Sequence, residues 1–369
     1  MKLKSVISII VIFLNFLSCA QDKNPKNKQH SYEVVVSDIA IPWGFVFLPD
    51  SSMLITEKSG ELIRFKDGKK IKINGLPTVN VLGQGGLMDI ELHPNYRENG
   101  WIYLSYASSD DEDDETANTT VMRAKLKNNS LVEKQILYKA SPDSGKGQHF
   151  GSRLEFDDSN YLYFSVGDRG SRDVNPQDIT IDCGKIYRLN DDGTIPEDNP
   201  FMNTPNAKKA IYSYGHRNPQ GMAKNPETGE IWIHEHGPKG GDEINIIHPG
   251  KNYGWPVISY GVNYSGTKFT EHTSLPGMEQ PIHYWVPSIA PSGMAFITSD
   301  VYPGWKGNLL VGSLKFQYLD RCVIKGEKVI EQDKLIDGLG RVRSVKQGPD
   351  GYIYAGVENV GIVKIIPKK

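Results

Sequence analysis

The sequence predicts an all-β fold, a six-bladed β-propeller of four-stranded antiparallel blades. A phrase made of a small or apolar stretch, a turn of the Pro-Asp-Gly type and a short aromatic or aliphatic strand recurs six times. The copies are spaced by roughly 40 to 70 residues, which suits propeller blades that carry insertions. The 369 residues include 37 glycines and 22 prolines, which favour many turns. No long segment with the 3.6-residue period of a helix competes with these strands.

Each copy of the phrase pairs two expected strands that are rich in β-branched and aromatic residues and bounded by Gly, Pro or Asp. The first three copies are residues 43–50 with 53–56, 86–94 with 101–104, and 153–157 with 161–164. The other three are residues 221–223 with 230–233, 293–296 with 308–312, and 342–345 with 351–356. A β-sandwich would not explain the repeated phrase. A propeller leaves loops on its two faces, so we expect function where loops of distant blades meet over the central channel.

Composition sets limits on the class of protein. The net charge is -2 and 38% of the residues are hydrophobic, which is ordinary for a soluble globular protein with a large core. No nucleic acid or other polyanion is expected as a partner. Outside the N-terminal region the cysteines are Cys183 and Cys322, which could form a disulfide or remain two separately buried thiols.

The N-terminus is typical of an exported protein. Lys2 and Lys4 precede an apolar run at residues 6–17, which predicts a secretory signal. Phe16-Leu17-Ser18-Cys19 resembles a bacterial lipobox, in which Cys19 would be acylated. We therefore expect a signal peptide at residues 1–18, a flexible tether at 19–31 and one propeller domain at 32–369. The expected location is the periplasm or cell envelope, with a lipid on Cys19 as the only membrane contact; soluble secretion is the alternative.

A loop at residues 235–256 is rich in glycine, proline and carboxylates. Few side chains would shield the main-chain carbonyls there. Ca²⁺ takes about six to eight oxygen ligands, carbonyls included, whereas Zn²⁺ prefers Cys and His. The loop is therefore a candidate calcium site, and a plain Gly/Pro turn between two strands is the alternative.

Polar side chains stand just before or after the predicted strands, where a propeller would turn them toward its channel. Four of them are cations, two of which stand in the same repeat, and together they indicate an anionic ligand with several carboxylates or phosphates. Taken singly, each is more simply a solvated or hydrogen-bonded structural residue. The set comprises Gln84, His149, Arg217, Asn218, Lys315, Arg341 and Arg343.

Several motifs in the same order resemble the soluble quinoprotein glucose dehydrogenase family, in particular its branch of aldose sugar dehydrogenases that depend on pyrroloquinoline quinone (PQQ). The resemblance extends from about Tyr32 to Ile366. The motifs that carry it are residues 83–87 (GQGGL), 149–153 (HFGSR), 215–221 (GHRNPQG), 236–243 (HGPKGGDE) and 251–256 (KNYGWP).

This resemblance implies a propeller that holds PQQ and Ca²⁺ over the channel mouth. His149 would be the general base that takes the proton of the sugar's anomeric hydroxyl while hydride passes to the quinone. Arg217 would stabilise the oxyanion that develops on the quinone. Further contacts are implied for the cofactor carboxylates, from Lys315, Arg341 and Arg343, and for its ring polar groups, from Asn218 and Gln84.

The same resemblance implies two calcium sites. The carbonyls of Gly237 and Pro238 would ligate a catalytic Ca²⁺ that polarises the quinone as a Lewis acid. Glu243 and the carbonyl of Tyr253 would hold a second, structural Ca²⁺. Aromatic faces suit a flat quinone or a sugar ring, so Tyr260 is expected at the cofactor. The residues expected at the sugar are Gln84, His149 and Trp285.

One residue departs from the family pattern: Gln148 stands where the glucose enzyme has an acidic residue directly before its catalytic histidine. Because Gln supplies no charge, this position does not predict how the pKa of the histidine is adjusted or which sugar is preferred. Two other stretches have plainer interpretations. The acidic run 110–115 lacks the glycine of an EF-hand and is expected to be a solvated loop tip, and residues 167–170 suit either the site or a tight turn.

The sequence thus predicts an oxidoreductase that converts aldoses to lactones and passes electrons to an external acceptor, as a monomer or homodimer. Two alternatives are a non-catalytic sugar-binding propeller and a calcium-dependent propeller lactonase. Neither alternative would use the cationic set, whereas a tricarboxylate quinone would.

Overall fold

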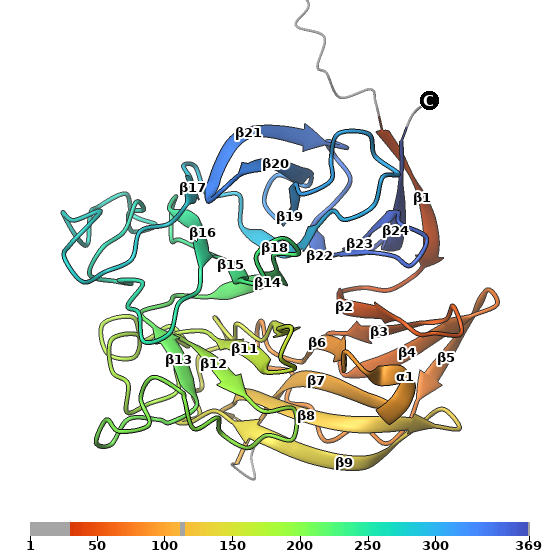
Figure 1. Ribbon diagram of the computed structural model, residues 1–369, viewed down its shortest axis with the longest axis horizontal. Coiled ribbons are helices and arrows are strands. Elements are labelled where there is room, and N and C mark those ends of the chain that lie inside the picture. The colour runs from red at the N-terminus through yellow and green to blue at the C-terminus, as the bar shows by residue number, and fades with distance from the viewer. Residues whose placement is uncertain (1–29, 111–114, 368–369) are drawn as a thin grey trace, which may run out of the picture.

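Six four-stranded antiparallel sheets surround a common centre in the computed structural model, which describes residues 30–110 and 115–367 (Figure 1). The predicted six-bladed β-propeller is therefore confirmed, and each copy of the sequence phrase supplies the first two strands of one blade. Within those ranges the helix is a single short turn, α1 (Tyr96–Asn99), and none is long and apolar enough to cross a bilayer. The expected signal peptide and most of the tether, including Cys19, lie outside the described residues, as do residues 111–114 of the acidic run.

Five blades are built from four consecutive strands each. Blade 1 contains β2 (Pro42–Phe47), β3 (Met53–Glu57), β4 (Glu61–Lys66) and β5 (Lys69–Ile73). Blade 2 contains β6 (Leu87–Leu92), β7 (Trp101–Ser108), β8 (Asn118–Lys127) and β9 (Ser130–Lys139). Blade 3 contains β10 (Leu154–Phe156), β11 (Leu162–Val166), β12 (Lys185–Leu189) and β13 (Ile211–Tyr214). Blade 4 contains β14 (Pro219–Lys224), β15 (Ile231–Glu235), β16 (Asp242–Ile246) and β17 (His283–Trp285). Blade 5 contains β18 (Pro291–Phe296), β19 (Leu309–Ser313), β20 (Leu319–Lys325) and β21 (Lys328–Leu335).

Blade 6 closes the ring with strands from both ends of the chain. Its inner strands are β22 (Val342–Gln347), β23 (Ile353–Val357) and β24 (Gly361–Pro367), and its fourth strand is β1 (His30–Ser37). β1 runs antiparallel to β24, with Tyr32 opposite Ile365, so the red and blue ends of the ribbon lie side by side in Figure 1. β1 includes His30 and Ser31, which precede the expected boundary at residue 32.

The core consists of layers between adjacent blades. β3, β11, β15, β19 and β23 are buried at every position, because the second strand of a blade is covered by neighbouring blades on both faces. Six apolar clusters each combine side chains of two adjacent blades; one unites Phe45 and Ile55 of blade 1 with Tyr354 and Ile362 of blade 6. Cys183 and Cys322, the cysteines of the described residues, are free and buried, so they form no disulfide with each other.

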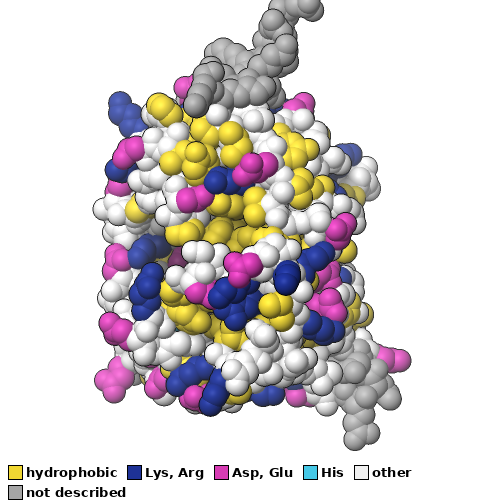
Figure 2. All heavy atoms as spheres, turned by 90° about the vertical axis from the view of Figure 1, so that its right-hand side faces the viewer, with side chains coloured by type: hydrophobic (Ala, Val, Ile, Leu, Met, Phe, Trp, Pro, Cys, Tyr) yellow, Lys and Arg dark blue, Asp and Glu magenta, His cyan; other side chains and the backbone are white. Residues whose placement is uncertain are grey.

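The outer edge around β1 carries charges of both signs among apolar side chains (Figure 2). Many of these charges are paired across strands: Arg64 with Asp50 at 2.6 Å, and Lys364 with Asp350 at 2.8 Å. This edge therefore has no large surface patch that is uniformly positive or uniformly negative.

The innermost strands are irregular at their first residues. In β2, β6, β14, β18 and β22 the pairing register with the second strand shifts there, as in a β-bulge. The shifts leave Trp43, Gln220, Gly293 and Arg343 without an opposite residue. A bulge turns the extra residue's main chain and side chain out of the ladder, so these strands present polar groups to the channel.

Candidate active site

A cavity of about 390 Å³ lies where segments of blades 3 and 4 meet on one face of the propeller. His149 comes from the segment before β10, and Asp168 follows β11. Arg217 immediately precedes β14, and Pro238 and Trp255 come from the glycine-rich loop region that the sequence singles out. The structure therefore brings together residues up to 118 positions apart, because the lining extends from Lys146 to Tyr264.

A histidine–carboxylate pair forms the wall of this cavity. His149 Nδ1 lies 2.6 Å from Asp168 Oδ1, and the other carboxylate oxygen accepts a 2.8 Å hydrogen bond from Trp255 Nε1. Gln84 also belongs here, because its Oε1 accepts the main-chain N–H of His149 at 2.9 Å. His149 has a φ of 60°, an unusual conformation for a residue other than glycine. A Cβ on Gly167 would lie 2.2 Å from the His149 carbonyl oxygen, so only glycine permits this close approach.

The pKa shifts of His149 and Asp168 indicate which atom of the pair carries the proton. Burial lowers the pKa of His149 and the charge of Arg217 lowers it further, against the opposing effect of the hydrogen bond that His149 donates to Asp168. Burial opposes ionisation of Asp168, but its bonds to His149, the charge of Arg217 and the Gly170 N–H together leave its pKa below the ordinary value. Asp168 is then a carboxylate that only accepts hydrogen bonds, so the proton of neutral His149 sits on Nδ1. The Nε2 lone pair remains free to take a proton.

Arg217 and Asn218 lie beside this pair and are only partly satisfied. Arg217 is 5% exposed, and one of its nitrogens donates to the His236 carbonyl at 3.2 Å. Asn218 accepts the Gly151 N–H at 3.1 Å through Oδ1. Among the residues that the structure describes, Arg217 Nε and Asn218 Nδ2 are buried polar atoms without a hydrogen-bond partner. Such groups are costly unless a ligand or water satisfies them.

A second, smaller cavity lies behind Arg217 and contains three of the expected metal ligands, Gly237, Glu243 and Tyr253. Burial raises the pKa of Glu243 to about 8, and the nearby charge of Glu235 raises it as well. Glu243 accepts a hydrogen bond from Asn245 at 3.3 Å, and none of the ion pairs among the described residues includes it. Glu235 Oε1 lies 2.9 Å from His216 Nδ1, so Glu243 is the carboxylate of this pair without an ion-pair partner among the described residues. A cation bound beside it would offset the repulsion between the two carboxylates.

The loop carrying Gly237 is held by Asp242. This carboxylate accepts the Gly237 N–H at 2.8 Å and the N–H groups of Ile289 and Ala290 at 2.7 and 2.8 Å. A Cβ on Gly237 would lie 2.2 Å from the Gly240 carbonyl oxygen. Asp242 thus fixes the loop from within, and no group of three or more His, Cys, Asp and Glu side chains in the described ranges is arranged to hold a metal. A cation here would depend on main-chain oxygens.

The remaining predicted cations lie on blades 5 and 6. Arg341 and Arg343 share one carboxylate, Glu358: Arg341 Nε lies 2.6 Å from Oε2, and Arg343 Nε lies 3.1 Å from Oε1. Arg341 also donates to the Leu314 carbonyl at 3.2 Å, next to exposed Lys315. The three cations therefore form one group, and Glu358 neutralises part of its charge.

Two predicted aromatic residues lie apart from the His149 cavity. Tyr260 stacks on Tyr284 with ring centroids 3.9 Å apart and donates to Gln280. Trp285 is buried between blades 4 and 5, where its Nε1 donates to Asp320 Oδ2 at 3.0 Å. Neither side chain lines the cavity, and Trp285 has its polar atom engaged elsewhere.

Sequence reasoning gave no role to Asp168, Trp255 or Glu358. Asp168 lies in the stretch 167–170, for which a tight turn was an equally good explanation. It supplies the carboxylate that Gln148 cannot, and the Gln148 side chain instead lies against Gly170. A glycine-flanked acid directly after a buried strand, as in Gly167-Asp168, was the available signal.

Comparisons with known proteins show the family to which the chain belongs. Residues 39–364 match the family model described as glucose/sorbosone dehydrogenase. The aldose sugar dehydrogenase YliI of Escherichia coli strain K12 is 41% identical over 346 residues, covering 91% of this chain and 92% of that protein. The structure of the soluble Escherichia coli aldose sugar dehydrogenase in its apo-form matches with a TM-score of 0.88 and 40% identity, over 92% of this chain and 100% of that one. The PQQ-bound form of aldose sugar dehydrogenase from Streptomyces coelicolor matches with a TM-score of 0.73 and 26% identity, over 92% and 98% of the two chains. The resemblance seen in the motifs is therefore confirmed, and the chain belongs to the glucose/sorbosone dehydrogenase family.

Proposed function

We propose that this protein is a PQQ- and calcium-dependent aldose dehydrogenase that oxidises the anomeric carbon of aldoses to lactones. The observation that carries the proposal is the His149–Asp168 pair, which faces a cavity shared with Arg217 and Pro238. Family membership and the PQQ-bound relative from Streptomyces coelicolor support the choice of cofactor.

The chain's own residues supply the acid–base chemistry. Asp168 holds the proton of His149 on Nδ1, so Nε2 takes the proton from the anomeric hydroxyl as the C–H bond breaks. Because burial and Arg217 lower the pKa of His149, the imidazole is neutral and ready to act at neutral pH. The guanidinium of Arg217 places a fixed positive charge where negative charge develops. When bound, PQQ supplies the quinone that accepts a hydride, and Ca²⁺ polarises that quinone as a Lewis acid.

The residues present fit the cofactor. The unpartnered Arg217 Nε and Asn218 Nδ2 are donors without acceptors, which the oxygens of a quinone carboxylate could satisfy. The group on blades 5 and 6 carries three positive charges, from Lys315, Arg341 and Arg343, and one negative charge, from Glu358. The net positive charge that remains can bind an anion.

The residues also fit calcium. The main-chain carbonyls of Gly237 and Pro238 would ligate the catalytic ion, and Glu243 with the Tyr253 carbonyl would ligate the second. The buried Glu235 and the partly buried Glu243 carboxylates support the second site, because a divalent cation would offset their repulsion.

Reconstitution tests the proposal. Purified protein is incubated with PQQ and Ca²⁺, and reduction of an artificial dye is followed with a panel of aldoses. Dye reduction with at least one aldose, absent without PQQ, is expected. PQQ binding without reduction would instead favour a sugar-binding propeller, and lactone hydrolysis that needs Ca²⁺ but no PQQ would favour a lactonase.

We further propose that the protein works in the periplasm or cell envelope, anchored by a lipid on Cys19, and passes electrons to an external acceptor. The lipobox-like residues 16–19 support this location. Metabolic labelling with a fatty-acid analogue should mark the wild-type protein and leave Cys19→Ala unlabelled. Equal labelling of both would exclude Cys19 as the anchor.

A further inference from the structure

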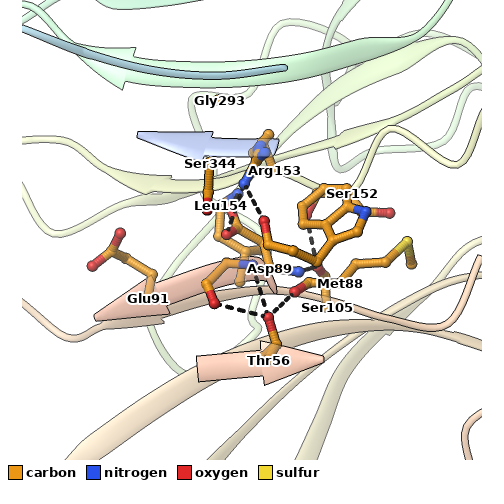
Figure 3. Close-up of polar contacts among 12 residues, drawn as sticks. Thr56, Met88, Asp89, Glu91, Ser105, Ser152, Arg153, Leu154, Gly293 and Ser344 are labelled. Atoms are coloured by element: carbon orange, nitrogen blue, oxygen red, sulfur yellow. Dashed lines mark hydrogen bonds and ion pairs between the residues drawn. The ribbon is translucent and has the colours of Figure 1, made fainter. Parts of the chain in front are cut away.

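The centre of the propeller holds an arginine that the proposed chemistry does not use. Arg153 ends the motif that begins with His149, immediately before β10 of blade 3, and it is 4% exposed. Figure 3 shows its guanidinium directed at Asp89 of blade 2, with Ser344 of blade 6 close by. Arg153 Nη1 lies 3.1 Å from Asp89 Oδ1, and Asp89 Oδ2 accepts the main-chain N–H of Leu154 at 3.0 Å. The charge of Arg153 is thus balanced deep in the channel.

The guanidinium also reaches the other four blades. Nε donates to the Gln220 carbonyl of blade 4 at 2.6 Å, and Nη1 donates to the Trp43 carbonyl of blade 1 at 3.2 Å. Nη2 donates to the Arg343 carbonyl of blade 6 at 2.6 Å and lies 3.5 Å from Ser292 Oγ of blade 5. One side chain therefore bonds to the innermost strand region of every other blade.

The three carbonyls that accept hydrogen bonds from Arg153 all lie at irregular positions of the innermost strands. Trp43, Gln220 and Arg343 are the extra residues at the register shifts of β2, β14 and β22. A bulged residue loses its ladder partner, and a buried carbonyl without a partner is costly. Arginine has five N–H donors in one rigid plane, which suits several acceptors arranged around one point. Arg153 thus satisfies the groups that the bulges turn into the channel.

These bulges determine where site residues lie. Gln220 lies two residues after Asn218 and three after Arg217, and Arg343 is itself one of the three cations of blades 5 and 6. The Gln220 side chain links the two strands again, because its Oε1 accepts Arg343 Nη1 at 3.0 Å. Arg153 therefore sets the spacing among three segments of three blades: its own, which carries His149, the one with Arg217, and the one with Arg343.

We propose that Arg153 is a positioning residue, which holds the bulged inner strands so that the cationic groups of blades 4 and 6 converge at the distance that a polyanionic cofactor requires. This inference rests on the proposed function only for the identity of the cofactor. Arg153 does not touch the substrate; it acts through the strands that carry the residues expected to do so.

The test compares Arg153→Lys with Arg188→Lys. Lysine keeps the charge but cannot reach the same set of acceptors. Arg188 is a matched control, because it is 7% exposed and ion-paired to Asp198, and its side-chain hydrogen bonds go to Asp198 and Asn199 of blade 3 alone. Amide hydrogen exchange without cofactor should speed up at residues 217–221 and 341–344 in Arg153→Lys alone. Titration with PQQ and Ca²⁺, followed by fluorescence quenching, should show at least about tenfold weaker binding in Arg153→Lys and less than about twofold in the control.

Each outcome decides the inference. Unchanged exchange at both segments, or equal PQQ affinity in the two variants at matched melting temperatures, would overturn it. If the wild-type protein binds no PQQ, the proposed function fails and the exchange experiment alone decides whether Arg153 positions these strands. Should Arg153→Lys not fold, Ser292→Ala replaces it. That variant removes the Ser292 Oγ donor to the Arg343 carbonyl, 2.8 Å away, and should raise exchange at residues 341–344; no change there would count against the proposal.

Discussion

Replacing Asp168 by asparagine should slow the reaction while moving its pH dependence in a defined direction. The bond between Asp168 and His149 is 2.6 Å long and buried, so it is charge-assisted and worth about 1.5–3 kcal/mol. An asparagine amide that donates toward Nδ1 would also place the imidazole proton on Nε2, where it blocks proton uptake. Since about 1.4 kcal/mol corresponds to a tenfold change in rate, kcat should fall about 10- to 100-fold.

The pH profile makes this prediction specific. Asp168 raises the pKa of His149 against the larger effect of burial, so its loss should lower that pKa further. The acid limb of kcat, which reports protonation of the base, should then move to lower pH although the plateau is lower. Dye reduction across pH 4–9 measures both, with Asp178→Asn on the same segment as a control whose carboxylate bonds to Thr180. An unchanged kcat, or an acid limb at higher pH, would refute the role given to Asp168.

Three other variants test separate parts of the molecule. His149→Ala should keep PQQ affinity within about threefold but lose most turnover, because the base acts only on the sugar proton; comparable turnover would show that the base is another residue. Glu243→Gln should abolish most of the rise in melting temperature on adding Ca²⁺, whereas exposed Glu227→Gln should respond like the wild type; equal responses would place the ion elsewhere. Burial and the charge of Glu91 raise the pKa of Glu155 to about 7. Since its folded pKa exceeds the unfolded one, stability is lost as pH rises from about 4.5 through 7. Glu155→Gln should therefore flatten the fall in melting temperature between pH 5 and 8, and parallel curves would contradict this.

The blade architecture could be predicted because its signal is local and repeated. Every copy of the sequence phrase contains both strands and the turn between them, so no knowledge of distant contacts is needed. Ring closure by β1 could not be predicted this way, since β1 lacks the phrase and pairs with the far end of the chain. The first two strands of a blade carry the signal, whereas outer strands such as β21 are mostly solvent-exposed and have weak patterns.

The site was predictable where residue type alone indicated chemistry, as for His149 and Arg217. It was not predictable where a role depends on a partner from another segment. Asp168 gains its role from His149, and the charge of Arg341 is partly neutralised by Glu358, which follows β23 of the same blade. Trp285 shows the remaining difficulty: in β17 it is buried while the adjacent Tyr284 is exposed, and sequence did not say which of the two faces solvent.

The pairing of β1 with β24 also dictates the order of events during synthesis. β1 leaves the ribosome first, but its partner reaches Pro367, so His30 waits for roughly 17–70 s at ordinary elongation rates. Blades 1 to 5 are contiguous in sequence and can form as they emerge, whereas β1 stays an unpaired strand with exposed amide edges until the end. Ring closure is then the last folding step, and Arg217 and Arg343 reach their final separation only with it. A nascent chain released before β24 would hold most of its sheets and still lack a competent site.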